Sequence, residues 1–252
     1  MARSILCVHA HPDDEALFTG GLLAKTKSEG GRSAVITCTD GRWGYSPGHI
    51  EVGHEDHDPE ATALQRLSDL RHSAEILGVE RLIPLQYFDS GMRGWPVNTW
   101  PQAFVNQDLE VVAAQLAAEI DRFKPDLVIT YDRFGVYGHP DHVKAHDATM
   151  AALRSTNHHP ELWLVTVSVK AAASMMASLH GTEGELPQWL VDMGEFGTPD
   201  EDIVDVLKVG EFLSVKRAAI AAHASQLDNH FFLEMDEASF ATMLGTERYA
   251  KG

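Results

Sequence analysis

The sequence predicts an α/β fold with a mostly parallel sheet and helices on both faces. Apolar runs of strand length alternate with longer helical segments over the first two-thirds of the chain, and a polar cluster follows two of these runs. Right-handed strand–helix–strand connections would wind such a chain into a doubly wound sheet. No linker or internal repeat interrupts the pattern, so residues 1–252 are expected to form a single domain.

Five strands and five helices are expected. The strands are residues 4–8, 34–39, 82–88, 126–131 and 162–169. The helices are residues 15–27, 59–77, 109–123, 139–153 and 212–226.

The first strand is short and apolar on both faces, which is typical of the middle of a parallel sheet. The helix that follows has apolar residues near helical spacing, including Leu17, Leu22 and Leu23. It tolerates the pair Gly20-Gly21, which costs helix stability. We attribute this pair to close packing against the sheet.

Residues 40–58 form the longest expected loop, with four glycines, one proline and three histidines. A loop of this length is usually functional or disordered, and we interpret it as a mobile rim over the site. We interpret its histidines as solvated side chains rather than a second metal site. The following helix has a leucine stripe from Leu64 to Leu77 and stops at Gly78.

The later elements are marked by prolines. Lys124-Pro125 closes the helix 109–123, and Pro140 suits the first turn of the helix 139–153. After Lys170 the pattern weakens, and residues 181–202 look like an acidic loop.

The composition excludes several classes of function. A formal net charge of -17 argues against binding to a nucleic-acid backbone or to an anionic membrane surface. No apolar run approaches the roughly 20 residues that span a bilayer, and no signal peptide is recognisable. We therefore expect a cytoplasmic protein in which Cys7 and Cys38 are reduced, buried thiols; a metal site that includes Cys7 is an alternative.

Two histidine–aspartate clusters follow predicted strands. The sequence HPDD starts at His11, after the first strand, and HPDH ends at His142, after the fourth strand. Ligands of open α/β sheets bind at the carboxyl ends of strands. If these two strands are neighbours, His11, Asp14 and His142 can converge into the two-imidazole, one-carboxylate ligand set of a catalytic zinc with an open position. Ferrous iron remains an alternative, whereas calcium and magnesium prefer oxygen ligands.

The remaining polar residues of the clusters suggest acid–base chemistry. Adjacent side chains diverge, so we assign Asp14 to the metal and Asp13 to the role of general base. His139 could protonate the leaving group or stabilise an oxyanion as an imidazolium. Each cluster alone could be a helix cap, but two in matching turns favour a metal site. The chain lacks the Gly-x-Ser-x-Gly and glycine-rich signatures of serine hydrolases and dinucleotide-binding proteins.

The two clusters, read as AHPDDE at residues 10–15 and GHPDH at residues 138–142, resemble the LmbE/PIG-L family of metal-dependent de-N-acetylases. TCTDG at residues 37–41, YFDSGM at residues 87–92 and HASQ at residues 223–226 also resemble family patterns. The resemblance implies a Rossmann-like three-layer sandwich. It also implies hydrolysis of an acetamido group, usually on N-acetylglucosamine, to an amine and acetate.

The resemblance further implies roles for individual residues. It places the metal on His11, Asp14 and His142, with Asp13 as the base and His139 stabilising the tetrahedral intermediate. Tyr137 resembles a tyrosine that helps to polarise the amide carbonyl in some members.

Two more residues match the mycothiol branch of the family. Arg66 and Asp89 stand where that branch has sugar-contacting residues; the alternatives are a helix-surface charge and a turn former. His223 could belong either to the core or to the site. Asp69 stands where the family usually has glutamate.

The function expected from the sequence is a zinc-dependent amidohydrolase that deacetylates an N-acetylglucosamine-type sugar or its conjugate. Alternatives are an amidase of the mycothiol S-conjugate type, a deacetylase that tailors a secondary metabolite, and a non-catalytic sugar-binding protein. A binding protein would need neither Asp13 nor His139, which argues against the last of these. The expected partner is a small molecule, and a homo-oligomer is left open.

Overall fold

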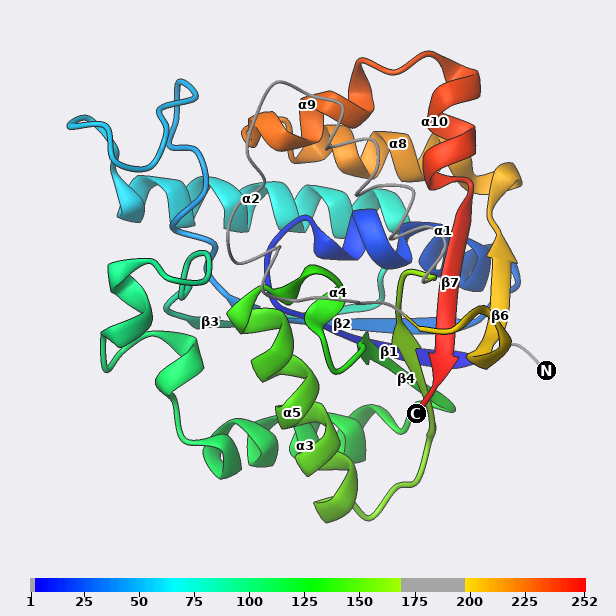
Figure 1. Ribbon diagram of the computed structural model, residues 1–252. Coiled ribbons are helices and arrows are strands. Elements are labelled where there is room, and N and C mark those ends of the chain that lie inside the picture. Colours follow the sequence, from blue (N-terminus) through cyan, green and yellow to red (C-terminus); the bar gives the residue numbers. More distant parts are fainter. Residues whose placement is uncertain (1–2, 169–197) are drawn as a thin grey trace.

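The computed structural model of the protein describes residues 3–168 and 198–252 (Figure 1). Within these residues, seven strands form one sheet in the order β3-β2-β1-β4-β5-β7-β6. The strands are β1 Ser4–His9, β2 Arg32–Thr39, β3 Arg81–Tyr87, β4 Leu127–Tyr131, β5 Glu161–Val165, β6 Ile203–Lys208 and β7 Thr246–Lys251. The helices are α1 Asp14–Ser28, α2 Pro59–Leu77, α3 Leu109–Phe123, α4 Gly135–Gly138, α5 Pro140–Ser155, α8 Leu213–Ala222, α9 Leu227–Leu233 and α10 Glu237–Leu244.

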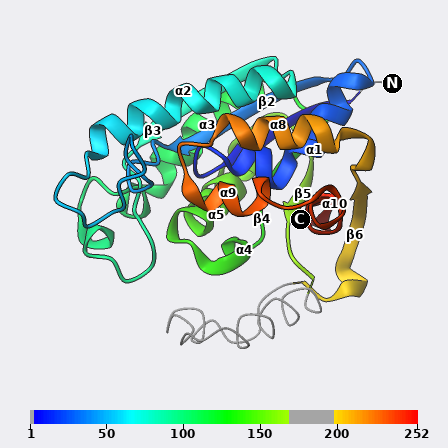
Figure 2. The same ribbon diagram turned by 90° about the horizontal axis from the view of Figure 1, so that it is seen from above.

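The helices cover both faces of the sheet, as the sequence predicts. Helices α1, α2 and α8 pack together on one face, and α3 and α5 pack together on the other (Figures 1 and 2). Strands β1 to β5 are all parallel. The expected α/β sandwich with a mostly parallel sheet is therefore confirmed. None of the helices in the described part of the chain is long and apolar enough to cross a membrane.

The pairing of β1 with β4 is the feature of the sheet that matters for function. The two strands are parallel neighbours, with Cys7 opposite Ile129. The chain runs outward from β1 to β2 and β3, and then returns to place β4 on the other side of β1. The two strands therefore flank the point where the strand order reverses, which is where open α/β sheets bind ligands.

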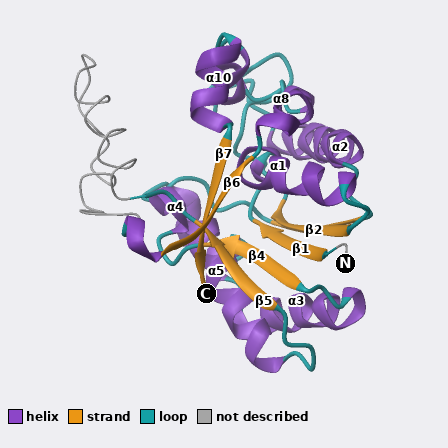
Figure 3. Cartoon of the chain, turned by 90° about the vertical axis from the view of Figure 1, so that its right-hand side faces the viewer, coloured by secondary structure: helices purple, strands orange, loops and turns teal. Residues whose placement is uncertain are grey.

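The last strands were not predicted. β7 is antiparallel to both β5 and β6 and lies between them, as Figure 3 shows. Its sequence, TERYAK, is polar at alternate positions and carries no apolar run, so it does not resemble the parallel strands. The expected strand 162–169 ends at Val165, and its last residue lies outside the described residues. Most of the expected loop 181–202 lies outside them as well, and β6 starts where that loop was expected to end.

The expected helix 212–226 ends four residues early, and a separate helix follows it. Helix α8 ends at Ala222, and α9 begins at Leu227. Between them the chain turns at His223, and the Gln226 side chain bonds to both backbone groups of Tyr45. The break therefore ties this turn to the loop 40–58.

Helix α2 has the predicted bounds, and the second half of its predicted stripe, Leu70, Ala74 and Leu77, is buried, whereas the first half is not. In the first half of α2 the buried side chains are polar, whereas Leu64 is 71% exposed. The buried residues of α2 are Thr62, Arg66, Asp69, Leu70, Ser73, Ala74 and Leu77. The helix turns polar side chains inward because this half of it lies over the site rather than over the apolar core.

The core is formed by both sheet faces and the inner faces of the helices. Leu116 of α3 is fully buried in it, together with the five residues of β4. Cys7 and Cys38 are free thiols buried in the same core, and burial raises the pKa of the Cys7 thiol to about 12. The thiols therefore act as small apolar residues, as expected.

Replacing Leu116 with alanine is expected to lower the free energy of unfolding by about 2–5 kcal/mol, because it leaves a cavity in the core. Urea denaturation measures this loss. The matched control is Leu64→Ala on the exposed side of α2, which is expected to change stability by about 0.5 kcal/mol or less. Equal losses in the two variants would contradict this placement of the core.

Candidate active site

Two strand-to-helix turns carry the polar clusters to one place. β1 ends at His9, and α1 begins at Asp14 after a tight turn in which Asp13 has a left-handed backbone with φ 108°. α5 begins at Pro140, and the His139 side chain caps it by accepting the backbone N–H of Asp141. Since β1 and β4 are adjacent, both turns lie at the same edge of the sheet.

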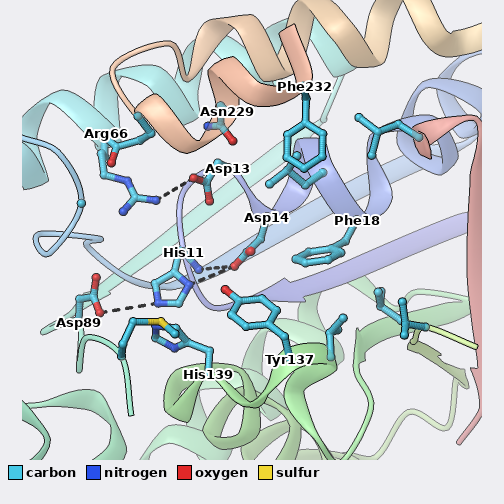
Figure 4. Close-up of a pocket in the computed structure, with 18 of the residues that line it drawn as sticks. His11, Asp13, Asp14, Phe18, Arg66, Asp89, Tyr137, His139, Asn229 and Phe232 are labelled. Atoms are coloured by element: carbon cyan, nitrogen blue, oxygen red, sulfur yellow. Dashed lines mark hydrogen bonds and ion pairs between the residues drawn. The ribbon is translucent and has the colours of Figure 1, made fainter. Parts of the chain in front are cut away.

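Three atoms that could bind a metal ion meet between these turns, and Figure 4 shows His11 and Asp14, which carry two of them. His11 Nδ1 lies 3.2 Å from His142 Nε2 and 3.4 Å from Asp14 Oδ2. Asp14 Oδ2 lies 3.5 Å from His142 Nε2. A tetrahedral ion with ligand bonds of about 2.0–2.1 Å keeps its ligands roughly 3.3–3.5 Å apart. The three side chains thus fit a zinc-sized ion without rearrangement.

When the two imidazoles are neutral, as metal binding requires, their outer hydrogen bonds leave these inner nitrogens unprotonated. His142 Nδ1 donates to the carbonyl oxygen of Gly135 at 3.2 Å. His11 Nε2 donates to the Asp141 carboxylate at 3.3 Å. Because each neutral ring carries one proton, the lone pairs of His11 Nδ1 and His142 Nε2 face the shared space. Such outer partners are typical of metal-bound histidines.

The Asp14 carboxylate is held as an anion. Its Oδ2 accepts the Tyr131 hydroxyl at 2.6 Å and the backbone N–H of His11 at 2.8 Å. Burial opposes ionisation, but the neighbouring His142 and His11 outweigh it and hold the pKa of Asp14 well below its usual range. The Tyr131 ring also stacks on the His142 ring at 4.1 Å. One tyrosine therefore orients two of the three ligands.

Two further groups of side chains are close enough together to hold a metal ion. His139 joins His11 and His142 in a group of three close imidazoles, with its ring centroid 4.4 Å from that of His11. Asp89 and Asp141 form another group with His11, but they lie at its Nε2 atom, on the far side of the ring from Asp14. We favour the set with Asp14 because its three ligand atoms lie 3.2–3.5 Å apart and each imidazole has an outer hydrogen-bond partner.

Asp13 points into the cavity beside the ligands. Its carboxylate accepts Arg66 Nη2 at 3.0 Å, and 17% of the side chain is exposed. Burial and the nearby Asp14 raise the pKa of Asp13, whereas Arg66 lowers it, and the net direction is upward. A carboxylate with a raised pKa next to the ligands is suited to take up and return a proton.

A buried ion pair supports the backbone of Asp13. Glu15 accepts the N–H of Asp13 at 3.0 Å, the hydroxyl of Ser73, and His223 Nε2 at 2.7 Å. Burial opposes the charge on both partners, but each stabilises the other, so the pKa of Glu15 is lowered and that of His223 is raised. His223 thus supports the site from the core and does not line the cavity.

Tyr137 and His139 lie on the opposite wall. Tyr137 belongs to the distorted turn α4, where Val136 has φ 64°, a strained conformation for a β-branched residue. The Tyr137 ring packs edge-on against the His142 ring at 5.0 Å. Burial, together with Asp14 and Asp13, raises the pKa of the Tyr137 phenol well above its usual range, so the phenol keeps its proton.

The two residues implied in sugar binding are buried. Arg66 is 6% exposed and also donates to the carbonyl oxygens of Gly41 and Pro12, so it is not a helix-surface charge. Asp89 Oδ1 accepts the N–H of Gly91 at 2.7 Å and lies 3.7 Å from His11 Nε2. The structure thus places both residues in the wall of the cavity, and Asp89 also forms a turn.

The cavity above the ligands has a volume of about 770 Å³. The loop 40–58 supplies part of its rim through Trp43 and Tyr45, and the Trp43 indole N–H donates to the carbonyl oxygen of Asp89. The three loop histidines bond within the loop or to α8–α9 and lie outside the cavity lining. Mobility of this rim remains a prediction.

Three supporting residues were not predicted from the sequence. Asp141 lies inside the HPDH cluster, so its place between two selected histidines was a usable signal. Tyr131 is the last residue of β4, where a buried hydroxyl at the end of a strand is also informative. Glu15 and His223 are 208 positions apart, and no local sequence pattern predicts their contact.

Two imidazoles and a carboxylate at the ends of the central strands define a class of α/β hydrolases with a metal-binding constellation. The chain belongs to the PIG-L family of GlcNAc-PI de-N-acetylases, whose family model matches residues 6–153. A 1D-myo-inositol 2-acetamido-2-deoxy-alpha-D-glucopyranoside deacetylase from Acidothermus cellulolyticus is 37% identical over 92% of this chain and 83% of its own length. A protein of the same name from Geodermatophilus obscurus is 34% identical over 98% of this chain and 91% of its own.

Solved structures share the fold at lower identity. The A40926 pseudoaglycone deacetylase is 21% identical, with a TM-score of 0.64 over 99% of this chain and 96% of that one. The N,N'-diacetylchitobiose deacetylase of Pyrococcus horikoshii is 19% identical, with a TM-score of 0.61 over 100% and 84%. A 4-carboxy-2-hydroxymuconate hydratase from Pseudomonas putida also matches, at 18% identity and a TM-score of 0.63 over 99% and 95%. The fold alone therefore does not determine the reaction.

Replacing Tyr131 with phenylalanine is expected to weaken zinc binding by about 10- to 100-fold, because Asp14 loses a hydrogen-bond donor. Competition with a chromophoric chelator measures the affinity. The matched control is Tyr87→Phe, whose hydroxyl bonds to Gln115 on the surface and is expected to leave zinc affinity unchanged. Unchanged affinity in both variants would show that Tyr131 does not orient the ligands.

Replacing His223 with glutamine is expected to destabilise the protein by about 3 kcal/mol near pH 6, because the charge on Glu15 loses its partner. The raised pKa of His223 adds stability that is complete below its ordinary value of about 6.5 and is lost as the pH rises through the folded-state pKa. The difference from the wild type should therefore shrink at alkaline pH. Urea denaturation at a series of pH values tests this, with the exposed His72→Gln as control. A gap independent of pH would contradict it.

Proposed function

We propose that the protein is a zinc-dependent de-N-acetylase. It hydrolyses the acetamido group of an N-acetylglucosamine unit, carried on a conjugate such as an inositol glycoside, and releases acetate and a free amine. The observation that carries the proposal is the triangle of His11 Nδ1, Asp14 Oδ2 and His142 Nε2, whose atoms lie 3.2–3.5 Å apart. The family and the inositol-glycoside deacetylases that the chain resembles support the choice of substrate.

Zinc suits this donor set better than the hard cations, because two of the three ligands are imidazoles; ferrous iron fits the same set. When bound, the metal lowers the pKa of a water molecule and polarises the amide carbonyl.

Asp13 acts as the general base. It takes a proton from the attacking water as the water oxygen bonds to the acetyl carbon. Arg66 holds the carboxylate in one orientation and prevents its pKa from rising further. As the C–N bond breaks, Asp13 returns the proton to the departing nitrogen, so a single group serves both steps.

His139 donates a hydrogen bond to the carbonyl oxygen as negative charge develops there. Its Nδ1 accepts the backbone N–H of Asp141, so Nε2 carries the proton. Burial and the neighbouring His11 and His142 hold the pKa of His139 well below its usual range. A neutral imidazole therefore replaces the imidazolium expected from the sequence, and the phenol of Tyr137 is a second neutral donor from the same wall.

Asp89 is proposed to accept a hydrogen bond from a sugar hydroxyl, since its carboxylate lines the cavity next to His11. The Arg66 guanidinium already donates to Asp13 and to the carbonyl oxygens of Gly41 and Pro12. Arg66 is therefore proposed to contact the sugar only through its remaining N–H groups.

Replacing Asp13 with asparagine is expected to lower kcat for acetate release by roughly two to four decades, because the amide cannot take up the proton. The assay uses N-acetylglucosaminyl inositol with detection of the free amine, and the zinc content of each variant is measured alongside. Asp108→Asn, at the start of α3 and remote from the cavity, is the matched control. A zinc-loaded Asp13→Asn variant with normal activity would refute the base assignment, and activity that survives complete chelation would refute the metal dependence.

A further inference from the structure

The cavity has two chemically different flanks. On one side of the ligands lie charged groups, with Arg66 at Asp13 and Asp89 at His11. On the other side lie apolar side chains that we name the acyl lobe, and Thr166, Lys216, Glu247 and Arg248 line the same cavity. The members of the acyl lobe are Leu17, Phe18, Val165, Val167, Phe232 and Leu244.

We propose that the site also hydrolyses amides of longer, linear aliphatic acids, with the acyl chain seated in the acyl lobe. This inference rests on the proposed function, because it uses the same metal centre and the same base. It extends that function from acetyl groups to fatty N-acyl groups on an amino sugar.

The acyl lobe begins directly beside the ligands. The Phe18 ring lies 6.0 Å from the His142 ring and meets it edge-on. Figure 4 shows Phe18 and Phe232 on the side of the site away from Arg66 and Asp89. An acyl group attached to a carbonyl at the ligands would therefore meet the apolar wall at its first methylene groups.

The geometry of an amide decides which part of a substrate enters which flank. A secondary amide is planar and trans, so the substituent on nitrogen and the chain on the carbonyl carbon extend in opposite directions. The departing nitrogen must face Asp13, because Asp13 returns the proton to it. Asp13 is bonded to Arg66, so the sugar lies on the charged flank and the acyl chain lies on the apolar one.

The side chains of the acyl lobe pack against the core and also line the cavity. Val165 belongs to the hydrophobic core, and the other five members pack against that core while remaining only partly buried. Their exposed faces line the cavity. Covering this surface with methylene groups removes it from water, whereas an acetyl group offers a single methyl.

Most of the acyl lobe comes from a part of the chain that the family model does not match. Four of its six members follow residue 153, where the match ends, whereas Asp13, Arg66 and Asp89 all lie inside it. The family match therefore does not by itself supply the apolar flank.

The reaction needs only water as co-substrate. The water oxygen bonds to the acyl carbon, the C–N bond breaks, and the proton taken by Asp13 goes to the amine. The products are an amino sugar and a fatty carboxylate, and no oxidant or reductant takes part.

The test is a series of N-acyl glucosamines with acetyl, butanoyl, hexanoyl and octanoyl groups, assayed with the zinc-loaded full chain. We expect kcat/KM to rise by roughly two- to fourfold for each added methylene until the lobe is filled. A fall in kcat/KM with chain length, in an enzyme that cleaves the acetyl compound, overturns the inference and leaves the proposed function intact. Cleavage of the octanoyl compound but not the acetyl one supports the lobe and overturns the acetyl specificity. Failure to cleave any member overturns both.

Octyl N-acetylglucosaminide separates the acyl chain from the aglycone as the occupant. If an alkyl aglycone raises kcat/KM and an alkyl acyl group does not, the apolar flank binds the aglycone, and the inference is wrong. A gain confined to the acyl series supports it.

Leu244→Trp fills the acyl lobe from α10. It is expected to lower the octanoyl-to-acetyl ratio of kcat/KM by roughly tenfold or more, because the tryptophan takes the space of the chain. The same substitution at the exposed Leu64 of α2 is the matched control and is expected to leave the ratio unchanged. An unchanged ratio in a folded, zinc-loaded Leu244→Trp protein would overturn the placement of the chain. If that variant does not fold, the wild-type acyl series decides alone.

Discussion

The parallel pairing of β1 with β4 is the constraint on which the site depends. It places two strand-to-helix turns, about 130 residues apart in sequence, at one edge of the sheet. Within that edge, ligand atoms approach to 3.2–3.5 Å, a spacing that lone pairs without a cation between them do not favour. The surrounding hydrogen bonds from Tyr131, Asp141 and Gly135 fix the direction of each ligand, so the site is organised before a cation arrives.

The adjacent aspartates show how the environment assigns roles to identical side chains. Asp14 accepts two hydrogen bonds beside two imidazoles, and its pKa is lowered. Asp13 precedes it and has a left-handed backbone, and its carboxylate points to Arg66 and the cavity. The pKa of Asp13 is raised. Opposite shifts in two neighbouring carboxyl groups are the pattern expected for a ligand and a proton carrier. The left-handed backbone at Asp13 is thus what separates the two functions.

The sequence predicted what local patterns encode. The bounds of α2 and α3 follow from caps and hydrophobic runs, and the two matching motifs indicated that β1 and β4 are neighbours. The last third of the fold did not follow, because β7 is an antiparallel strand whose burial comes from its neighbours rather than from an apolar run. The stripe of α2 held only in its second half, because its first half turns Thr62 and Arg66 inward toward the site instead of Leu64. The Glu15–His223 pair depends on tertiary structure alone.

The polar wall and the apolar wall of the cavity come from different parts of the chain. The polar groups around His11 come from the turns after β1 and β4, from α2 and from the turn after β3, whereas the end of β5, α9 and α10 carry most of the acyl lobe. Substitutions among the acyl-lobe side chains therefore change the lining of the cavity without removing a hydrogen bond around His11. The apolar lining can thus diverge toward new molecules by single substitutions, whereas exchanging the whole chain after β5 would also remove His223, the partner of Glu15 beneath Asp13.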